Sequence, residues 1–535
     1  MGMTCGEATI RLLEKYGVTT VFGIPGVHTL DMCRGFSGGD NISNINHIQA
    51  RNEQGAGFMA EGWARATGNV GVALVISGPG VTNASTALGQ CYADSLPMLL
   101  ISAEPDSRTI GKGWGVLHEV TEQKKLTEPI TALSATAYRP SDIPDLLAQA
   151  FTIFSSQRPR PAHISIPLDV QSKIVEEDWF PVVLPERPTA KASEVNRAVD
   201  LLRKAQNPLV MIGGGAQEAS KELIQIAENI GAIVVCSTAG KGIVPDEHPL
   251  SVSASTVRPE VQNLMPKADV IMAVGTEISE TDSFVERLNI AGDIIRIDID
   301  SKKLSDYYPA KVGLVADAKS ACSAILEALG PAKVCQSNVN TRVMELRKTI
   351  SSNLSPSEGR HKNFLDILRK VAAEDTIFSG DACQLVYTGS FAFPVSGPRR
   401  WFYPAGFCAL GNALPNGIGA KLAQPDVPVV VLAGDGGFMF TMPELLTAAE
   451  SSISLPIIIW ENGGLKQIQD DMDSLDITRV GVEGINPNFE LLAKACHCEA
   501  FRPKSKDEFR DNFRKSLNLG KPSLLIINEW ESWLQ

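Results

Sequence analysis

The residues best suited to chemistry stand at the ends of two apolar segments in the last third of the chain. Residues 429–432 run into the sequence GDGG, which contains Asp435, and residues 455–460 run into ENGG, which contains Asn462. Both segments are typical of buried parallel strands, whose carboxyl ends lie side by side at one edge of a sheet. A carboxylate, an amide oxygen and the backbone carbonyl of Gly464 form a hard-oxygen set that suits Mg²⁺.

The glycines around Asp435 predict a second property of this edge. Gly434, Gly436 and Gly437 let backbone N–H groups approach a phosphate, and the helix expected next favours anions at its start. We expect that helix to begin with a capping box from Thr441 to Glu444. A GDGG sequence alone is most often a turn. The strand before it and the Asn after the next strand favour a Mg²⁺–diphosphate site instead.

The chain is long enough for several domains, and three is the natural number for 535 residues. Apolar strands alternate with helices throughout, which predicts an α/β fold of three doubly wound parallel-sheet domains. We place the domains at residues 1–180, 190–335 and 355–535. A segment rich in Pro and charge (176–192) and a polar stretch (333–360) would connect them.

Composition excludes several classes of protein. The net charge of −12 disfavours a nucleic-acid partner, and no apolar run is long enough for a membrane span. The first residues read as a helix and not as a signal peptide. The cysteines lack metal-binding spacing, so we interpret the cluster Cys496-His497-Cys498 as packing, and free thiols indicate the cytoplasm.

The GDG sequence followed by Asn462 resembles the signature of enzymes that bind thiamine diphosphate (ThDP). Further blocks match this family in its own order, and the chain is similar to the acetolactate synthase, benzoylformate decarboxylase and pyruvate decarboxylase group. The resemblance implies a pyrimidine-binding domain, a central domain and a diphosphate-binding domain. Two departures are Glu461 and Asn52, where the family has Asn and His. The matching blocks are FGIPG (22–26), RNEQGA (51–56), SGPGVTN (77–83) and ALGNALP (409–415).

The resemblance also implies roles for single residues. Glu53 would hydrogen-bond N1′ of the aminopyrimidine and so help to remove the thiazolium C2 proton. Leu410 would support the bent cofactor, and Asp435, Asn462 and Gly464 would bind Mg²⁺. Because the two cofactor halves would lie on different subunits, a homodimer with shared active sites is the minimal form and a homotetramer the usual one. The expected cofactor-binding residues are Pro25, Glu53, Asn83, Gln384, Cys408, Leu410, Gly434, Asp435, Gly436, Gly437, Asn462, Gly464 and Leu465.

Two histidines and the residues after the metal motif bear on the substrate. His28 and His118 stand where the family keeps active-site groups, and they would bind the substrate carboxylate and move a proton. The loops around both resemble a subgroup of 5-guanidino-2-oxopentanoate (2-ketoarginine) decarboxylases, which release 4-guanidinobutanal and CO₂. Gln467, Ile468 and Asp471 would line the substrate pocket, where a carboxylate suits a guanidinium.

Alternatives to this carboxy-lyase remain open. The chain could be an acetolactate synthase-like transferase or a benzaldehyde lyase-like carboligase. FAD is not expected, because the family's flavin-binding block reads GTEISE (275–280) here, and GGGA (213–216) is no dinucleotide fingerprint. A catalytically inactive regulatory paralogue is disfavoured, because such proteins usually lack the residues found here as Glu53 and Asp435.

Overall fold

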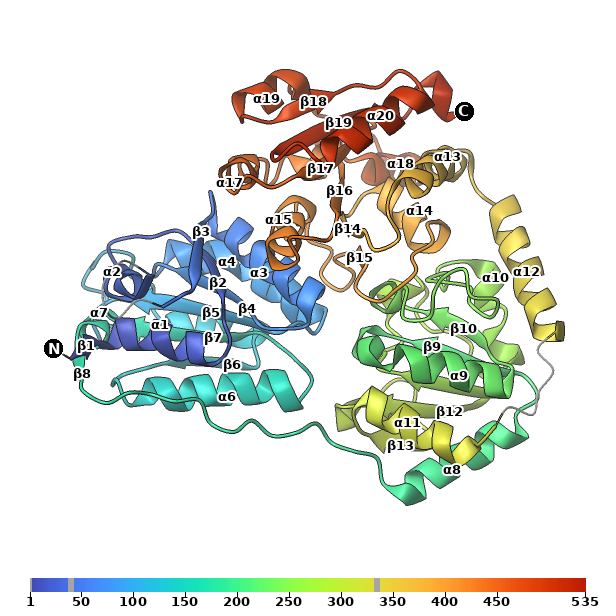
Figure 1. Ribbon diagram of the computed structural model, residues 1–535, viewed down its shortest axis with the longest axis horizontal. Coiled ribbons are helices and arrows are strands. Elements are labelled where there is room, and N and C mark those ends of the chain that lie inside the picture. The colour runs from blue at the N-terminus through green and yellow to red at the C-terminus, as the bar shows by residue number, and fades with distance from the viewer. Residues whose placement is uncertain (1, 37–42, 332–336) are drawn as a thin grey trace.

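The computed structural model describes residues 2–36, 43–331 and 337–535. Figure 1 shows three bodies, coloured blue to cyan, green to yellow, and orange to red along the chain, each built on its own sheet. Strand–helix alternation with parallel pairing inside each of these three sheets confirms the predicted α/β class. A short antiparallel pair lies apart from them, formed by β1 (Met3–Thr4) and β8 (Ile174–Val175).

The first sheet carries helices α1 (Cys5–Lys15), α3 (Glu53–Thr67), α4 (Pro79–Ala93) and α6 (Asp142–Ser156). Every residue of β4 and β5 is buried, as expected for strands covered on both faces. In spatial order the strands are β3 (Asn46–Gln49), β2 (Thr20–Gly23), β4 (Gly71–Val75), β5 (Met98–Glu104), β7 (Ala162–Pro167) and β6 (Leu133–Thr136).

The second sheet belongs to the central body. Its flanking helices include α8 (Ala192–Lys204), α9 (Ser220–Ile230) and α11 (Ala318–Leu329). The strand order is β10 (Ile233–Cys236), β9 (Pro208–Ile212), β11 (Val270–Val274), β12 (Asp293–Asp298) and β13 (Val312–Val315).

The third sheet positions the GDGG and ENGG sequences. Its strands are β15 (Trp401–Phe402), β14 (Ile377–Gly380), β16 (Val429–Gly434), β17 (Leu455–Glu461), β19 (Pro522–Asn528) and β18 (Glu499–Phe501). The helices around it are α13 (Pro356–Val371), α14 (Gln384–Ala392), α15 (Ala413–Ala423), α17 (Glu444–Glu450), α18 (Lys466–Ser474), α19 (Phe489–Ala495) and α20 (Lys506–Ser516).

Two connections join the bodies. The residues between β8 and α8 have no regular structure and run along the lower edge of the molecule in Figure 1. In the second connection, α12 (Ser337–Ser352) leads towards α13, and residues 333–336 of the predicted linker lie outside the described residues. None of the described helices is both long and apolar enough to cross a lipid bilayer.

The first and third bodies pack through α3 and α15, which lie side by side in Figure 1. A Cβ added at Gly62 of α3 would lie 2.1 Å from the carbonyl oxygen of Asn416. A Cβ added at Gly419 of α15 would lie 2.0 Å from the carbonyl oxygen of Met59. These two glycines permit the close crossing of the helices. The crossing fixes α3, and with it Glu53, against the third body.

Candidate active site

Glu53 is the first residue of α3, and its carboxylate is almost completely buried. The helix is capped by Asn52, whose side-chain oxygen accepts a hydrogen bond from the backbone N–H of Gln54 at 2.8 Å. Asn83, on the neighbouring helix α4, donates from its Nδ2 to the Glu53 Oε2 at 2.9 Å. The structure therefore brings together two residues that the sequence placed in separate blocks.

Glu444 also reaches this helix, and the sequence prediction for Glu444 was wrong. It does not form a capping box with Thr441, whose hydroxyl donates instead to the carbonyl of Gly411. Helix α17 begins at Glu444 itself, and the buried carboxylate crosses to the first body. There its Oε1 accepts hydrogen bonds from the backbone N–H groups of Arg51 at 3.0 Å and Asn52 at 3.1 Å. Burial raises the pKa of Glu444, against the lowering effect of these donors.

His28 and His118 are neighbours in the first body. Their rings meet edge to face with 4.8 Å between centroids, and the His28 Nδ1 is hydrogen-bonded to the hydroxyl of Ser77. Burial, followed by the nearby His118, lowers the pKa of His28, so its imidazole is neutral at neutral pH. His118 has a positive φ of 61°, and its Nδ1 is buried without a hydrogen-bond partner. A nitrogen left in this state is available to a ligand.

Asp435 and Asn462 are adjacent at the carboxyl ends of β16 and β17. The fully buried Asp435 carboxylate accepts hydrogen bonds from the backbone N–H groups of Asn462 at 3.2 Å, Gly463 at 2.9 Å and Gly464 at 3.2 Å. The oxygen that accepts these three bonds is Oδ2, and the side chain of Asn486 donates to it as well, at 2.8 Å. Sequence reasoning missed Asn486, because this residue lies in a loop without a motif of its own.

The donor set of this edge fits Mg²⁺. The Asn462 Nδ2 donates to Glu529 at 3.2 Å, which leaves its amide oxygen for a cation beside the Asp435 carboxylate. The carbonyl of Gly464 accepts one hydrogen bond, from the backbone N–H of Lys466 at 3.0 Å, and keeps a second lone pair. Glu461 does not join this set, because its carboxylate is paired with Arg502.

The glycine-rich loops pack so closely that a side chain in place of Gly436 or Gly437 would crowd its neighbours. A Cβ added at Gly436 would lie 3.1 Å from the backbone of Gly464, and one at Gly437 would lie 3.1 Å from the Asp381 carboxylate. Burial raises the pKa of Asp381 to about 6. Asp381 accepts a hydrogen bond from the backbone N–H of Gly411 at 3.0 Å, and this bond fixes the loop that carries Cys408 and Leu410. The remaining expected cofactor residues, Pro25, Gly434 and Leu465, follow or end strands β2, β16 and β17.

The residues predicted to line the substrate pocket lie on α18. Gln467 donates to Asp471 at 3.0 Å, and both side chains are exposed, as is Ile468. Gln384, at the start of α14, donates to Gln467 at 3.2 Å and to Asp470 at 2.9 Å. The expected diphosphate and substrate residues are therefore joined in one hydrogen-bonded group. The two acids differ, because Asp470 also pairs with Lys466.

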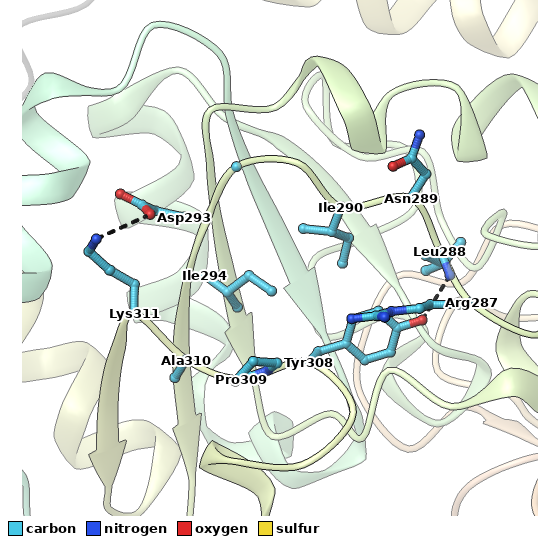
Figure 2. A pocket seen from close by; sticks show the side chains of 11 residues that line it. Arg287, Leu288, Asn289, Ile290, Asp293, Ile294, Tyr308, Pro309, Ala310 and Lys311 are labelled. Atoms are coloured by element: carbon cyan, nitrogen blue, oxygen red, sulfur yellow. Dashed lines mark hydrogen bonds and ion pairs between the residues drawn. The ribbon is translucent and has the colours of Figure 1, made fainter.

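Two of the hollows in the described part of the chain involve the central body, and neither is lined by a predicted catalytic residue. One is a groove of about 680 Å³ on the central body. In it, Arg287 lies over the ring of Tyr308 and Lys311 pairs with Asp293 (Figure 2). A cleft of about 760 Å³ lies where the three bodies meet, and residues of the segments 213–216 and 275–280 line part of it. In it, Glu277 pairs with Arg158 at 2.8 Å.

Comparison with known proteins agrees with this geometry. Residues 3–126 match the model of the N-terminal TPP-binding domain of thiamine pyrophosphate enzymes, residues 195–329 the central domain and residues 381–527 the C-terminal TPP-binding domain. The chain belongs to the thiamine pyrophosphate (thiamine diphosphate) enzymes, and the predicted family is confirmed. Thiamine diphosphate is therefore the cofactor of the fold.

Two of the relatives that cover nearly the whole chain have different names. The chain is 45% identical to the "Probable 2-ketoarginine decarboxylase AruI" of Pseudomonas aeruginosa, over 98% of this chain and 94% of the relative. It is 30% identical to the "Probable acetolactate synthase large subunit" of Methanocaldococcus jannaschii, over 98% and 92%.

Proposed function

We propose that this protein catalyses the ThDP- and Mg²⁺-dependent, non-oxidative decarboxylation of 5-guanidino-2-oxopentanoate to 4-guanidinobutanal and CO₂. The observation that carries the proposal is the identity of 45% to a protein named as a probable 2-ketoarginine decarboxylase, spread over the whole chain. The lower identity to acetolactate synthases supports carboligation as a second candidate.

The residues of the site fit the cofactor. When bound, thiamine diphosphate supplies a carbon nucleophile at C2 and the electron sink for loss of CO₂. Glu53, held by Asn83, would share a proton with N1′ of the aminopyrimidine. Asp435, Asn462 and the carbonyl of Gly464 would hold Mg²⁺, whose charge would offset that of the diphosphate. Gln384, Gly434, Gly436 and Gly437 would hold the diphosphate, and Pro25, Cys408, Leu410 and Leu465 would hold the rings.

His28 and His118 handle the substrate carboxylate and the proton. Decarboxylation of a 2-oxo acid replaces the carboxylate by hydrogen, so one proton must reach the former carbonyl carbon. A neutral His28 cannot donate that proton from an imidazolium, but it can donate a hydrogen bond to the carboxylate. The unpartnered Nδ1 of His118 suits proton transfer.

The far end of the pocket suits a cation. Asp471 is exposed on α18 and has a hydrogen bond from Gln467, whereas its neighbour Asp470 is already paired with Lys466. We assign the guanidinium of the substrate to Asp471, because a planar guanidinium binds a carboxylate through two hydrogen bonds.

The active form that we propose is a homodimer with shared active sites, assembled further into a homotetramer. Apolar side chains next to both halves of the site are exposed on a single chain, and a second copy would cover them. Examples are Val27 and Leu117 beside the two histidines, and Ile468, Val480 and Ile485 beside the metal loops. The cysteines that the structure describes are free thiols, which supports a cytoplasmic location.

A panel of 2-oxo acids tests the proposal. Purified protein with ThDP and Mg²⁺ is given 5-guanidino-2-oxopentanoate, 2-oxohexanoate, benzoylformate or pyruvate, and CO₂ and aldehyde are measured. We expect the guanidino acid to give the highest kcat/KM. Each substrate is repeated with an acceptor aldehyde or with added pyruvate. Faster formation of acetolactate from pyruvate than of aldehyde from the guanidino acid would reject decarboxylation in favour of carboligation.

A further inference from the structure

Glu529 lies beside the proposed metal site without belonging to it. Strands β17 and β19 pair in parallel, with Glu461 opposite Asn528, so the next residues, Asn462 and Glu529, leave the sheet together. The backbone N–H of Glu529 donates to the carbonyl of Glu461 at 3.0 Å. The Glu529 side chain is only 1% exposed, so water does not compete for its oxygens.

The carboxylate of Glu529 is surrounded by groups that donate hydrogen bonds. Its Oε1 accepts from the guanidinium of Arg360 at 2.8 Å, and its Oε2 accepts from the indole N–H of Trp460 at 3.1 Å and from the Asn462 Nδ2 at 3.2 Å. Guanidinium and indole groups can only donate. Glu529 is therefore held as an acceptor, independently of Asn462.

This arrangement decides which end of the Asn462 amide faces Glu529. A side-chain amide has one donor group and one acceptor, and turning it by half a rotation exchanges them. If the Asn462 amide were turned, its oxygen would face the carboxylate of Glu529. Two acceptors would then oppose each other and repel. The amide nitrogen therefore faces Glu529, and the amide oxygen is left for the cation that Asp435 would share.

We propose that Glu529 is a positioning residue of the magnesium site, which fixes the Asn462 amide so that its oxygen and not its nitrogen serves as the ligand. This inference rests on the proposed function, since it assumes that Asn462 binds Mg²⁺. Partners that orient metal ligands in this way typically change metal affinity 10- to 100-fold when they are removed.

The test measures metal affinity and not turnover. Protein freed of metal by a chelator is titrated with Mg²⁺ in a calorimeter in the presence of excess ThDP. We expect Glu529→Gln to weaken Mg²⁺ binding about 10- to 100-fold. Glu529→Asp keeps the charge but shortens the side chain, and it should weaken binding as well. If instead this variant binds like the wild type, the charge alone matters and the positioning role is wrong. Because it retains the charged partner of Arg360, Glu529→Asp serves as the test if Glu529→Gln does not fold.

Glu461→Gln is the matched control. Glu461 carries the same charge next to Asn462 in the chain, but its carboxylate pairs with Arg502 and not with the amide. We expect this variant to bind Mg²⁺ within about twofold of the wild type, since the partly exposed pair of Glu461 with Arg502 does not touch the Asn462 amide. A loss equal to that of Glu529→Gln would show that negative charge near the site, and not orientation of the amide, is responsible.

A double-mutant cycle separates positioning from general support of the fold. If Glu529 acts through Asn462, then Glu529→Gln should have no further effect on Mg²⁺ affinity in an Asn462→Ala background. Additive losses would overturn the inference and leave Glu529 a structural residue. If the wild type itself shows no Mg²⁺-dependent ThDP binding, the proposed metal site fails, and the inference fails with it.

Discussion

Asn83 donates a hydrogen bond to Glu53 at 2.9 Å, and this contact joins the start of α3 to the first turns of α4. The Glu53 carboxylate is buried, whereas Asn83 itself is exposed on the single chain. The residue that holds the proposed acid therefore adds little to the core. Loss of Asn83 should affect the chemistry of Glu53 more than the stability of the fold.

We predict that Asn83→Ala slows exchange of the C2 proton of bound ThDP by about five- to a hundredfold. The reason is that a hydrogen bond to a carboxylate is worth about 1–3 kcal/mol. NMR measures the exchange, and a thermal melt should show a midpoint close to that of the wild type. Thr82, one residue earlier, is also exposed, and Thr82→Ala should leave the exchange rate and the melting midpoint unchanged. Equal exchange rates in Asn83→Ala and the wild type would contradict the role of Asn83.

Glu53→Gln should reduce both C2-proton exchange and turnover by at least about 100-fold, since an amide cannot share the proton at N1′. Folding and association should survive, because the amide has nearly the same shape. The same NMR measurement, together with size-exclusion chromatography, checks both points. Unchanged exchange in a folded variant would remove Glu53 from the mechanism.

Glu444→Gln should slow C2-proton exchange and lower the free energy of unfolding by about 1–3 kcal/mol. An amide oxygen in the place of Oε1 can keep the two backbone N–H groups before Glu53. The NH₂ that replaces Oε2 would then oppose the donors on that side, the N–H of Arg51 at 3.2 Å and the hydroxyl of Thr447 at 2.7 Å. Glu450→Gln is the control, because Glu450 is itself exposed and pairs with the side chain of the same Arg51, not with its backbone. Urea unfolding and NMR exchange compare the two variants. A similar small effect of both would mean that the contact from Glu444 does not position Glu53.

We predict that the folded protein loses stability in acid because His163 is buried in its neutral form. Burial lowers the pKa of His163 to about 3, and its ring nitrogens are hydrogen-bonded to the hydroxyls of Ser102 and Thr127. The unfolded chain binds a proton at this residue near pH 6.5, and the folded chain only near pH 3. The contribution of His163 is therefore complete above pH 6.5 and is lost as pH falls towards 3. Thermal melts from pH 7 to pH 4 should show a steeper decline for the wild type than for His163→Gln. Parallel profiles would contradict this assignment.

The sequence predicted the strands that carry the site, because buried parallel strands are continuous apolar runs. Where a strand ends in polar residues the prediction stopped early. The apolar run predicts a strand over residues 98–102, but β5 continues through Glu104, a buried carboxyl whose pKa is raised by burial. A charged residue inside a sheet breaks the apolar pattern, so periodicity alone does not reveal it.

The partners of the predicted residues were not predictable in the same way. Asp435 and Asn462 follow neighbouring strands, so their proximity could be inferred from local sequence. Asn486 reaches Asp435 from a distant loop, and Glu444 reaches the first body, because of how the elements pack. For Glu444 the local pattern even misled, since a Thr three residues before a Glu is the signature of a capping box. Contacts between segments that are far apart in the sequence cannot be predicted from the spacing of residues within one segment.

The substrate is tested most sharply at Asp471. A charge-assisted hydrogen bond contributes about 1.5–3 kcal/mol, roughly ten- to a hundredfold in kcat/KM. Asp471→Asn should therefore lose about that much activity on 5-guanidino-2-oxopentanoate and change little on 2-oxohexanoate, which has no cation. Asp476→Asn, the same change at an exposed position beyond the end of α18, should leave both substrates unaffected. An equal loss on the two substrates would mean that Asp471 supports the cofactor or the fold. No loss on either would assign the guanidinium to another group, and Asp470 would be the next to test, because it accepts from Gln384 in the same hydrogen-bonded group.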